Sequence, residues 1–390
     1  MRRVRLKEIG TFYSGLSGKS KSDFSEGNAL LVTYRNIFNN PVLNPAIKDT
    51  VVVGKDEKQN EVLWGDILIT GSSETPADAG MSSVVLFNPQ EKMYLNSFCF
   101  GFRLNDMNEV LPSYIGHLLR STSIRTAISK TAFGVTRFNV NRMRFADIEI
   151  PLPPLNIQKE IVSILDSFTS LIDKMKQEVE MRKKQMEYYR EKLMAPQKNW
   201  KIKTLGEIGT FTRGNGLQKS DFRVKGFPCV HYGQIHTYYN TCIYKTKSFC
   251  EEDLAKKLQK ASYGDLLIAT TSEDVKACCK AAVWFGAGDV AYSGDSFCYS
   301  HDQDPKYMAY LFQTEMFAKQ KQKAATGAKV IRVSGESMAS FSFAFPPLVQ
   351  QRQIASILDI FETYISKLEK MIELRQKQYE YYREKLLTFE

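Results

Sequence analysis

A stretch of 41 residues occurs twice in this chain. Residues 153–193 and residues 346–386 align without a gap, and 23 of the 41 positions are identical. The two copies begin 193 residues apart, so the chain is a duplication and not a solenoid, which needs three or more stacked repeats. A duplicated chain can fold with approximate twofold symmetry, and double-stranded DNA is the first twofold target to consider.

Apolar side chains recur every seven residues in both copies, which predicts two long coiled-coil helices. Nine of ten seam positions are apolar in each copy, and the tenth is an arginine, Arg182 or Arg375. A helix of 40 residues is about 60 Å long and needs a partner to cover its seam. The candidate seam residues are Ile161, Leu165, Phe168, Ile172, Arg182, Ile354, Leu358, Phe361, Ile365 and Arg375.

The two arginines set the expected direction of pairing. Parallel helices would bring Arg182 and Arg375 together as like charges, whereas antiparallel helices separate them. Antiparallel pairing also offers Asp359 to Arg182, and Asp166 to Arg375. We therefore expect antiparallel helices joined by these two ion pairs. The alternative is that each helix packs only on its own globule.

Shorter matching islands extend the repeat into the segments before each helix. LKEIGTF at 6–12 returns as LGEIGTF at 205–211, and NSFCF at 96–100 returns as DSFCY at 295–299. Short β-type runs with one helical stretch in each segment, near 112–131 and 305–325, predict α+β globules. The expected fold is two globules separated by two long antiparallel coiled-coil helices, as a pseudo-twofold internal repeat. The expected domains are 1–152, helix 153–195, linker 196–203, 204–345 and helix 346–390.

Composition narrows the class of protein. Lysine and arginine outnumber aspartate and glutamate by 53 to 43, and the resulting pI near 9.0 is typical of nucleic-acid-binding proteins. Seven cysteines without a CxxC pair indicate reduced thiols in a cytoplasmic protein. The N-terminus lacks the apolar run of a secretory signal, and no apolar stretch is long enough to span a membrane.

The motifs of common catalytic sites are absent from the sequence. Residues 15–20 end like a phosphate-binding loop, but Tyr13 stands where that loop needs its first glycine. Neither GxSxG nor HExxH occurs, nor does the [NDS]PP[YF] run of an amino-methyltransferase. Cys229, His231, His236 and Cys242 do not have the spacing of a zinc finger. We therefore expect no catalytic residue, metal or cofactor in this chain.

Three loops at matching points of the two globules collect basic and planar polar side chains. Arg, Lys, Asn and Gln read base edges, whereas Ser, Thr and Tyr mostly hold phosphates. Because the frame repeats and these loops do not, they predict two different surfaces that read an asymmetric, two-part DNA sequence. In the first globule the expected DNA-binding residues are Lys19, Lys21, Tyr34, Arg35, Asn36, Asn39, Arg137, Asn139 and Arg142. In the second they are Arg213, Asn215, Gln218, Lys219, His231, Tyr232, Gln234, His236, Tyr238, Lys329 and Arg332.

The order of these motifs resembles a known family. Each globule opens with LxEIGxF, carries GD[IL]L in its middle, and leads through two prolines and a glutamine into a helix ending in YYREKL. The second copy departs in having Phe343, Ala344 and Phe345 before its prolines. Across essentially its full length, the chain resembles the specificity (S) subunits of type I restriction–modification systems.

That resemblance implies a non-catalytic DNA-binding subunit. It implies two target-recognition domains at opposite ends of an antiparallel helical spacer, each reading one half of a bipartite site. Half-sites read from one face of DNA would lie about 10 bp apart. It also implies two copies of a modification subunit, which hold the S-adenosylmethionine and the adenine-N6 methyltransferase site, and restriction and translocase subunits that use ATP and Mg. The alternatives are a sequence-independent nucleic-acid clamp, a coiled-coil scaffold, or the specificity module of another methyltransferase system.

Overall fold

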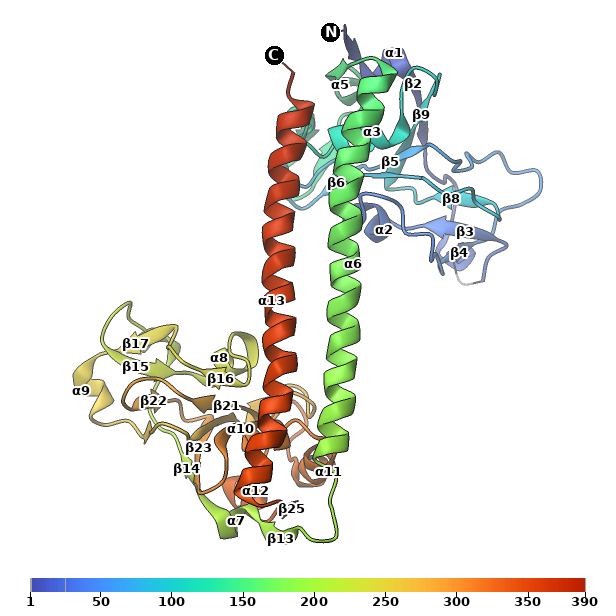
Figure 1. The fold of residues 1–390 in the computed structure, drawn as a ribbon. Coiled ribbons are helices and arrows are strands. Elements are labelled where there is room, and N and C mark those ends of the chain that lie inside the picture. Colours follow the sequence, from blue (N-terminus) through green and yellow to red (C-terminus); the bar gives the residue numbers. More distant parts are fainter. Residues whose placement is uncertain (1, 25, 390) are drawn as a thin grey trace. The chain divides into compact units, whose positions relative to one another are not determined.

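The computed structural model describes residues 2–24 and 26–389, and the chain divides into two compact units. Unit 1 comprises residues 1–176 and 370–390, and unit 2 comprises residues 177–369. Each unit holds one globule and a part of each long helix, α6 (Leu155–Leu193) and α13 (Leu348–Leu387) (Figure 1). None of the described helices combines the length and the hydropathy that crossing a lipid bilayer requires.

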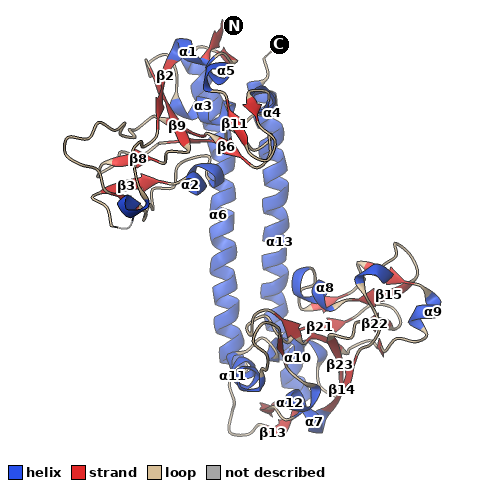
Figure 2. Ribbon diagram, turned by 180° about the vertical axis from the view of Figure 1, so that it is seen from behind, coloured by secondary structure: helices blue, strands red, loops and turns tan. Residues whose placement is uncertain are grey.

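The globule of unit 1 mixes short strands with short helices (Figure 2). Its strands are β1 (Arg2–Arg5), β2 (Gly10–Ser14), β3 (Ala29–Val32), β4 (Thr50–Val51), β5 (Ile67–Thr70), β6 (Ser72–Ser73), β7 (Ser82–Val84), β8 (Met93–Leu95), β9 (Cys99–Leu104), β10 (Ala132–Phe133), β11 (Phe138–Val140) and β12 (Glu149–Leu152). Its helices are α1 (Leu6–Ile9), α2 (Tyr34–Asn39), α3 (Pro112–Leu118), α4 (Thr122–Ser129) and α5 (Arg142–Ala146), with a 3-10 helix at Lys21–Phe24. The sheets have the orders β1-β12, β2-β9-β5-β7, β4-β3-β8 and β10-β11-β6.

The globule of unit 2 repeats the main strand pairings of unit 1 and adds edge strands to two of the sheets. Its strands are β13 (Lys201–Thr204), β14 (Gly209–Arg213), β15 (Phe227–Val230), β16 (Cys242–Ile243), β17 (Ser248–Cys250), β18 (Lys260–Ala261), β19 (Leu266–Ala269), β20 (Thr271–Ser272), β21 (Lys280–Trp284), β22 (Val290–Tyr292), β23 (Ser296–His301), β24 (Ile331–Arg332) and β25 (Ser342–Phe345). Its helices are α7 (Leu205–Ile208), α8 (Tyr232–Thr237), α9 (Glu252–Ala255), α10 (Pro305–Leu311), α11 (Glu315–Ala324) and α12 (Gly335–Ala339), with a 3-10 helix at Lys219–Asp221. The sheet β14-β23-β19-β21-β16 corresponds to β2-β9-β5-β7, β13-β25 to β1-β12, and the parallel pair β15-β22 to β3-β8.

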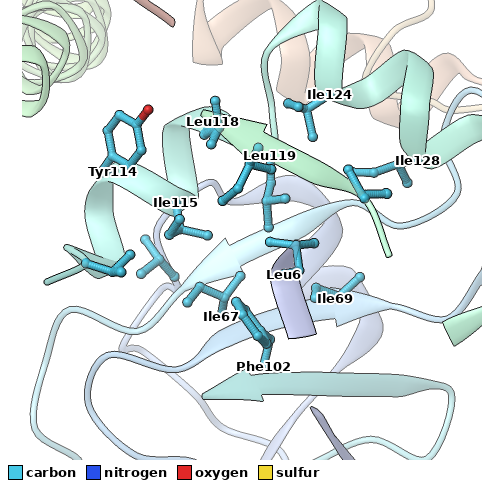
Figure 3. Close-up of a cluster of buried hydrophobic side chains, with 14 of the residues drawn as sticks. Leu6, Ile67, Ile69, Phe102, Tyr114, Ile115, Leu118, Leu119, Ile124 and Ile128 are labelled. Atoms are coloured by element: carbon cyan, nitrogen blue, oxygen red, sulfur yellow. The ribbon is translucent and has the colours of Figure 1, made fainter. Parts of the chain in front are cut away.

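The central strand of each main sheet is buried on both faces. Ile67 and Ile69 of β5 lie in a core beneath α3 and α4 (Figure 3), whereas Leu68 lies in a second core on the other face. Side chains alternate between the faces of a strand, so one apolar run serves both cores. The equivalent strand β19 does the same with Ile268 and Leu267.

The repeated glutamine at the start of each long helix is a structural residue. Gln158 is fully buried, and its Nε2 donates to the carbonyl oxygens of Glu109 and Pro153, both at 2.9 Å. Its Oε1 accepts from the backbone N–H of Leu111 at 2.9 Å. Gln351 makes the matching bonds to Pro346 and Asp304 in unit 2. The amide therefore ties the helix start to the segment that leads into α3 or α10.

The glutamate of the repeated YYREKL motif explains why the helical stretches near 112–131 and 305–325 are each broken into two helices. The first backbone N–H of α4, on Thr122, donates to the carboxylate of Glu384 at 2.9 Å. Similarly, the first N–H of α11, on Glu315, donates to Glu191 at 3.1 Å. A carboxylate satisfies an unpaired N–H and opposes the positive end of the helix dipole, so a second helix starts there.

In each unit the two long helices contact each other in opposite directions. In unit 1, Phe168 near the start of α6 stacks on Tyr382 near the end of α13, with ring centroids 5.4 Å apart. In unit 2, Tyr189 near the end of α6 stacks on Phe361 near the start of α13, at 5.6 Å. The other apolar seam positions, Ile161, Leu165, Ile172, Ile354, Leu358 and Ile365, are all buried.

The predicted ion pairs between the seam arginines and the aspartates are wrong. Arg182 pairs with Glu178 one turn earlier at 3.4 Å, and Arg375 donates to Gln378 at 2.6 Å. The carboxylate of Asp166 is bound by His117, and that of Asp359 by Tyr310 and Lys306. Both aspartates thus face the globule of their unit and not the other helix, a choice that heptad spacing alone does not reveal.

Strand pairing also changes the alignment of one repeated island. The sequence repeat aligns residues 96–100 with 295–299. In the structure, Phe100 pairs with Ile69, and Phe297 pairs with Ile268, which is the residue equivalent to Ile69. Phe100 therefore corresponds to Phe297. The segment from Val84 to Leu95 is two residues longer than its counterpart, residues 283–292, which shifts the register by two. Phe98 therefore corresponds to Asp295 and belongs to what differs between the units.

Candidate functional site

The two lysines of the first predicted loop in unit 1 differ in their exposure to solvent. Lys19 donates to Glu57 at 2.5 Å, and its side chain is only 8% exposed. The hydrogen bond from Lys19 lowers the pKa of Glu57 to about 2. Lys21 is exposed. Lys19 thus holds the loop in place, and Lys21 is the charge that an external ligand can reach.

The second predicted site in unit 1 lies on helix α2. The Tyr34 hydroxyl donates to the carbonyl oxygen of Ser72 at 2.9 Å, which fixes α2 against β6. The side-chain amide of Asn36 bonds to the loop that follows α2, because its Nδ2 donates to Asn44 and its Oδ1 accepts from Asn40. Arg35 and Asn39 are exposed. Within the described residues, neither of these two side chains has a hydrogen-bond partner.

The third predicted site is the hairpin β10–β11 with the start of α5. The Nε of Arg137 donates to Ser72 Oγ at 3.0 Å, and its guanidinium lies 5.1 Å from the centre of the Phe98 ring. Arg142 reaches Ser14 Oγ at 2.7 Å and lies over Phe100. Asn139 is exposed on β11.

Two of these predicted sites line one hollow, which we call the unit-1 hollow. It has a volume of about 630 Å³ and combines aromatic rings, hydroxyls, carboxylates and one arginine. Its lining residues are Tyr34, Phe38, Ser72, Ser73, Glu74, Thr75, Asp78, Asn96, Phe98, Thr136 and Arg137. Glu74, Asp78, Asn96 and Phe98 were not among the residues predicted from the sequence. Phe98 was not predicted because the sequence repeat aligns it with Phe297, which made it an apparent part of the repeated frame.

In unit 2, several predicted residues build the loops on which they lie. Asn215 bonds to the backbone of Lys257 and Gln259, at 2.9 and 2.8 Å. His231 caps α8 through Gly233 N–H, and Gln234 donates to Ser248. His236 Nε2 bonds to the carbonyl oxygen of Thr271 at 3.0 Å, as Tyr34 does to Ser72 in unit 1.

Other predicted residues of unit 2 stay open to solvent. Arg213, Lys219, Lys329 and Arg332 are exposed, and Lys247 lies 4.5 Å from the ring of the exposed Tyr238. A second hollow of about 520 Å³, the unit-2 hollow, joins the first two predicted loops. It is lined by Arg213, Gly214, Gly216, Leu217, Gln218, His231, Tyr232, Ser293, Gly294 and Asp295.

The same turn carries different side chains in the two units. Gly134 has φ 132° and Gly327 has φ 101°, in the left-handed region that favours glycine. A Cβ added to either glycine would lie 2.0 or 2.1 Å from the carbonyl oxygen three residues later. The turn continues with Val-Thr-Arg at 135–137 in unit 1 and with Ala-Lys-Val at 328–330 in unit 2. The backbone is constant there, and the chemistry is not.

A metal site and a reactive cysteine are two kinds of site that the described residues could form. No group of three His, Cys, Asp or Glu side chains among them is placed to hold a metal ion. Burial raises the pKa of the Cys229 and Cys242 thiols to about 12, so these cysteines are protonated near neutral pH. The two polar hollows are each lined by one arginine and by one or two carboxylates.

Unit 2 should become less stable in mild acid. Burial lowers the pKa of His231, His236 and His301 below the ordinary value of about 6.5. As pH falls through that value, the unfolded chain binds protons that the folded unit excludes, so stability is lost. Urea midpoints measured by circular dichroism should therefore be lower at pH 5.5 than at pH 7.5, and His301→Gln should reduce the difference. A midpoint that is constant or higher at pH 5.5 would contradict this.

Comparison with known proteins assigns a family profile to most of the chain. Residues 1–181 and 197–376 match the family described as "Type I restriction modification DNA specificity domain". The chain is 30% identical over 272 residues to a putative type I restriction enzyme specificity subunit of Haemophilus influenzae, covering 66% of this chain and 68% of that protein. It is 28% identical over 256 residues to the EcoR124I/EcoR124II specificity subunit of Escherichia coli, covering 62% and 63%. These matches thus span slightly less or slightly more than two thirds of the relatives' own length.

Solved structures share the fold. The crystal structure of a type-I restriction-modification system S subunit from M. genitalium matches with a TM-score of 0.56 and 14% identity, covering 100% of this chain and 96% of that one. A chain from a structure titled as the basis of "complex assembly" and "conformational transition of the type I R-M system" matches with a TM-score of 0.60 and 14% identity, covering 99% and 97%.

Proposed function

The chain belongs to the type I restriction–modification DNA specificity family, and we propose that it reads a bipartite, asymmetric DNA site with one globule for each half. Subunits of this family determine which DNA sequence the restriction–modification complex recognises. The chain is accordingly a recognition component that works with DNA and with the other subunits of that system.

One observation carries the bipartite, asymmetric reading. The two globules repeat the same main strand pairings, and each presents the same glycine turn, at Gly134 and at Gly327. The side chains on these turns and around the two hollows differ between the units. A constant frame with two different polar surfaces is suited to two different half-sites, since base edges are distinguished by side-chain donors and acceptors.

The remaining parts of the proposal concern partners and spacing. Two copies of a modification subunit would carry S-adenosylmethionine and the adenine-N6 methyltransferase site, and ATP and Mg would act in restriction and translocase subunits. Residues 153–195 and 346–390 would form the helical spacer between target-recognition domains at 1–152 and 204–345. Of the linker expected at 196–203, residues 201–203 belong to strand β13 of the unit-2 globule, so the linker would be shorter. The lack of a catalytic motif in the sequence agrees with chemistry in other chains.

Mapping N6-methyladenine in DNA from cells that express the chain with its modification subunit tests the proposal. The expected result is methylation within one split, asymmetric motif, and its loss when the chain is omitted. Methylation without any split motif would overturn the proposal. Equal binding to scrambled and selected DNA would favour a sequence-independent clamp, and no DNA binding with partners present would favour a coiled-coil scaffold.

A further inference from the structure

Several arginines of the two globules use their guanidinium groups for hydrogen bonds within the fold. Arg103 binds the buried Asp66 through Nε and Nη2, at 2.8 and 2.7 Å. Arg120 donates from Nε and Nη2 to the carbonyl oxygen of Ser82, and Arg125 uses both Nη atoms on backbone carbonyls. Such guanidinium groups do not have two adjacent N–H donors left free to bind a ligand.

Arg137 is held differently. Its Nε donates to Ser72 Oγ at 3.0 Å, and the guanidinium lies over Phe98, 5.1 Å from the ring centre. Within residues 2–24 and 26–389, neither of its Nη atoms has a hydrogen-bond partner. One bond and one ring therefore orient the group, and its two outer N–H donors remain available at the unit-1 hollow.

Arg213 in unit 2 is also hydrogen-bonded through Nε alone, although no aromatic ring among the described residues lies under its guanidinium. Its Nε donates to the carbonyl oxygen of Gly294 at 3.1 Å, and it lines the unit-2 hollow beside Gln218 and Asp295. Across the described part of the chain, its Nη atoms are likewise without a partner. Arg137 and Arg213 are the two arginines there that are hydrogen-bonded through Nε alone.

These two arginines occupy different positions of the repeated frame. The register of β11 and β24 places Val330 at the position equivalent to Arg137. The register of β14 and β2 places Ser14 at the position equivalent to Arg213. Each of the two arginines is thus replaced by another residue type, valine or serine, at the equivalent position of the other unit.

We propose that Arg137 and Arg213 each read the guanine of a G·C base pair, one in each half-site, an inference that rests on the proposed function. A guanidinium fork donates bidentately to guanine O6 and N7, which is the commonest specific contact in the major groove. Orientation by Ser72 and Phe98, or by Gly294, lowers the conformational entropy lost on binding.

The carboxylates beside the two forks favour a base over a phosphate. Glu74 and Asp78 line the unit-1 hollow with Arg137, and Asp295 lines the unit-2 hollow with Arg213. A phosphate would be repelled by these groups, whereas the N4 amino group of cytosine can donate a hydrogen bond to a carboxylate. An arginine with a neighbouring carboxylate carries the donor and acceptor pattern that matches a G·C pair.

The test uses the chain assembled with its modification subunits and DNA containing the mapped motif. Each guanine of the motif is replaced in turn by 7-deazaguanine, which lacks the N7 acceptor, and methyl transfer is measured for the native chain and for Arg137→Lys. We expect one guanine in one half-site to be sensitive in the native complex and insensitive in R137K. R137K should slow methylation of the native motif about ten- to hundredfold and weaken discrimination at that base pair alone.

Further variants complete the design. Arg213→Lys should produce the same pattern in the other half-site, Phe98→Leu should weaken the Arg137-dependent preference, and Arg352→Lys, at an exposed position of α13, should leave both half-sites unchanged. Equal loss by R137K on every sequence, with a reduced salt dependence, would identify a phosphate contact and overturn the inference. If the native complex methylates a split motif but no guanine shows this pattern, the inference alone fails. If it methylates no split motif, the proposed function fails.

Discussion

Replacing Gln158 by alanine should lower the free energy of unfolding by about 3–5 kcal/mol, because three backbone groups lose their partner at once. The side chain is fully buried and bonds to Glu109, Pro153 and Leu111, each at 2.9 Å. Alanine removes the amide and leaves these buried N–H and C=O groups without a hydrogen-bond partner. Urea denaturation followed by circular dichroism gives the difference directly.

The matched control is Gln376→Ala, which removes an exposed glutamine from the other long helix. Its side chain makes one bond, to Glu380 at 3.3 Å, so the expected change is within about 0.5 kcal/mol. Gln351→Ala in unit 2 should behave like Q158A, because Gln351 is also buried and makes the matching bonds. A loss below about 1 kcal/mol in Q158A would mean that other groups satisfy the backbone there.

Exchanging the three residues after Gly134 for those after Gly327 should reduce methylation of the native DNA motif by more than about a hundredfold. The exchange turns Val-Thr-Arg at 135–137 into Ala-Lys-Val and removes the oriented Arg137. Loss of a bidentate base contact costs about 1–3 kcal/mol, and lost contacts from the neighbouring side chains add to this. Methyl transfer by the assembled complex provides the measurement.

The exchange should leave the fold intact, which separates reading from stability. Both turns place glycine at a positive φ, and the residues 328–330 that would be transferred already follow such a glycine in unit 2. Val135 is 89% exposed, so its loss removes little buried surface. The urea midpoint is therefore expected to be unchanged. Unchanged methylation of the native motif would show that the turn does not read DNA.

Periodicity was sufficient to predict the long helices and the buried character of their seams. Leu165 and Leu358 are fully buried in their units, at spacings that the heptad pattern identifies. The partners of charged residues did not follow from that pattern. Asp166 and Asp359 lie on the helices, but their partners His117 and Tyr310 come from the globules. Contacts between distant segments depend on tertiary packing, which a local repeat does not encode.

The candidate site was predictable by region but not by residue. The loops at Tyr34 and Arg137 do meet at one hollow, yet Asn36 is consumed by the loop that carries it. Composition does not distinguish a polar side chain that builds a loop from one that stays free. Phe98 was missed for another reason, since only strand register shows that it corresponds to Asp295.

Single-molecule mapping of N6-methyladenine with the native chain and with the 135–137 exchange tests most directly whether each unit reads its own half-site. The native chain should methylate one split, asymmetric motif. The exchanged chain should methylate a motif in which one half has changed and the other half is the same. A change in both halves, or methylation without a split motif, would contradict the account of two independent readers on one repeated frame.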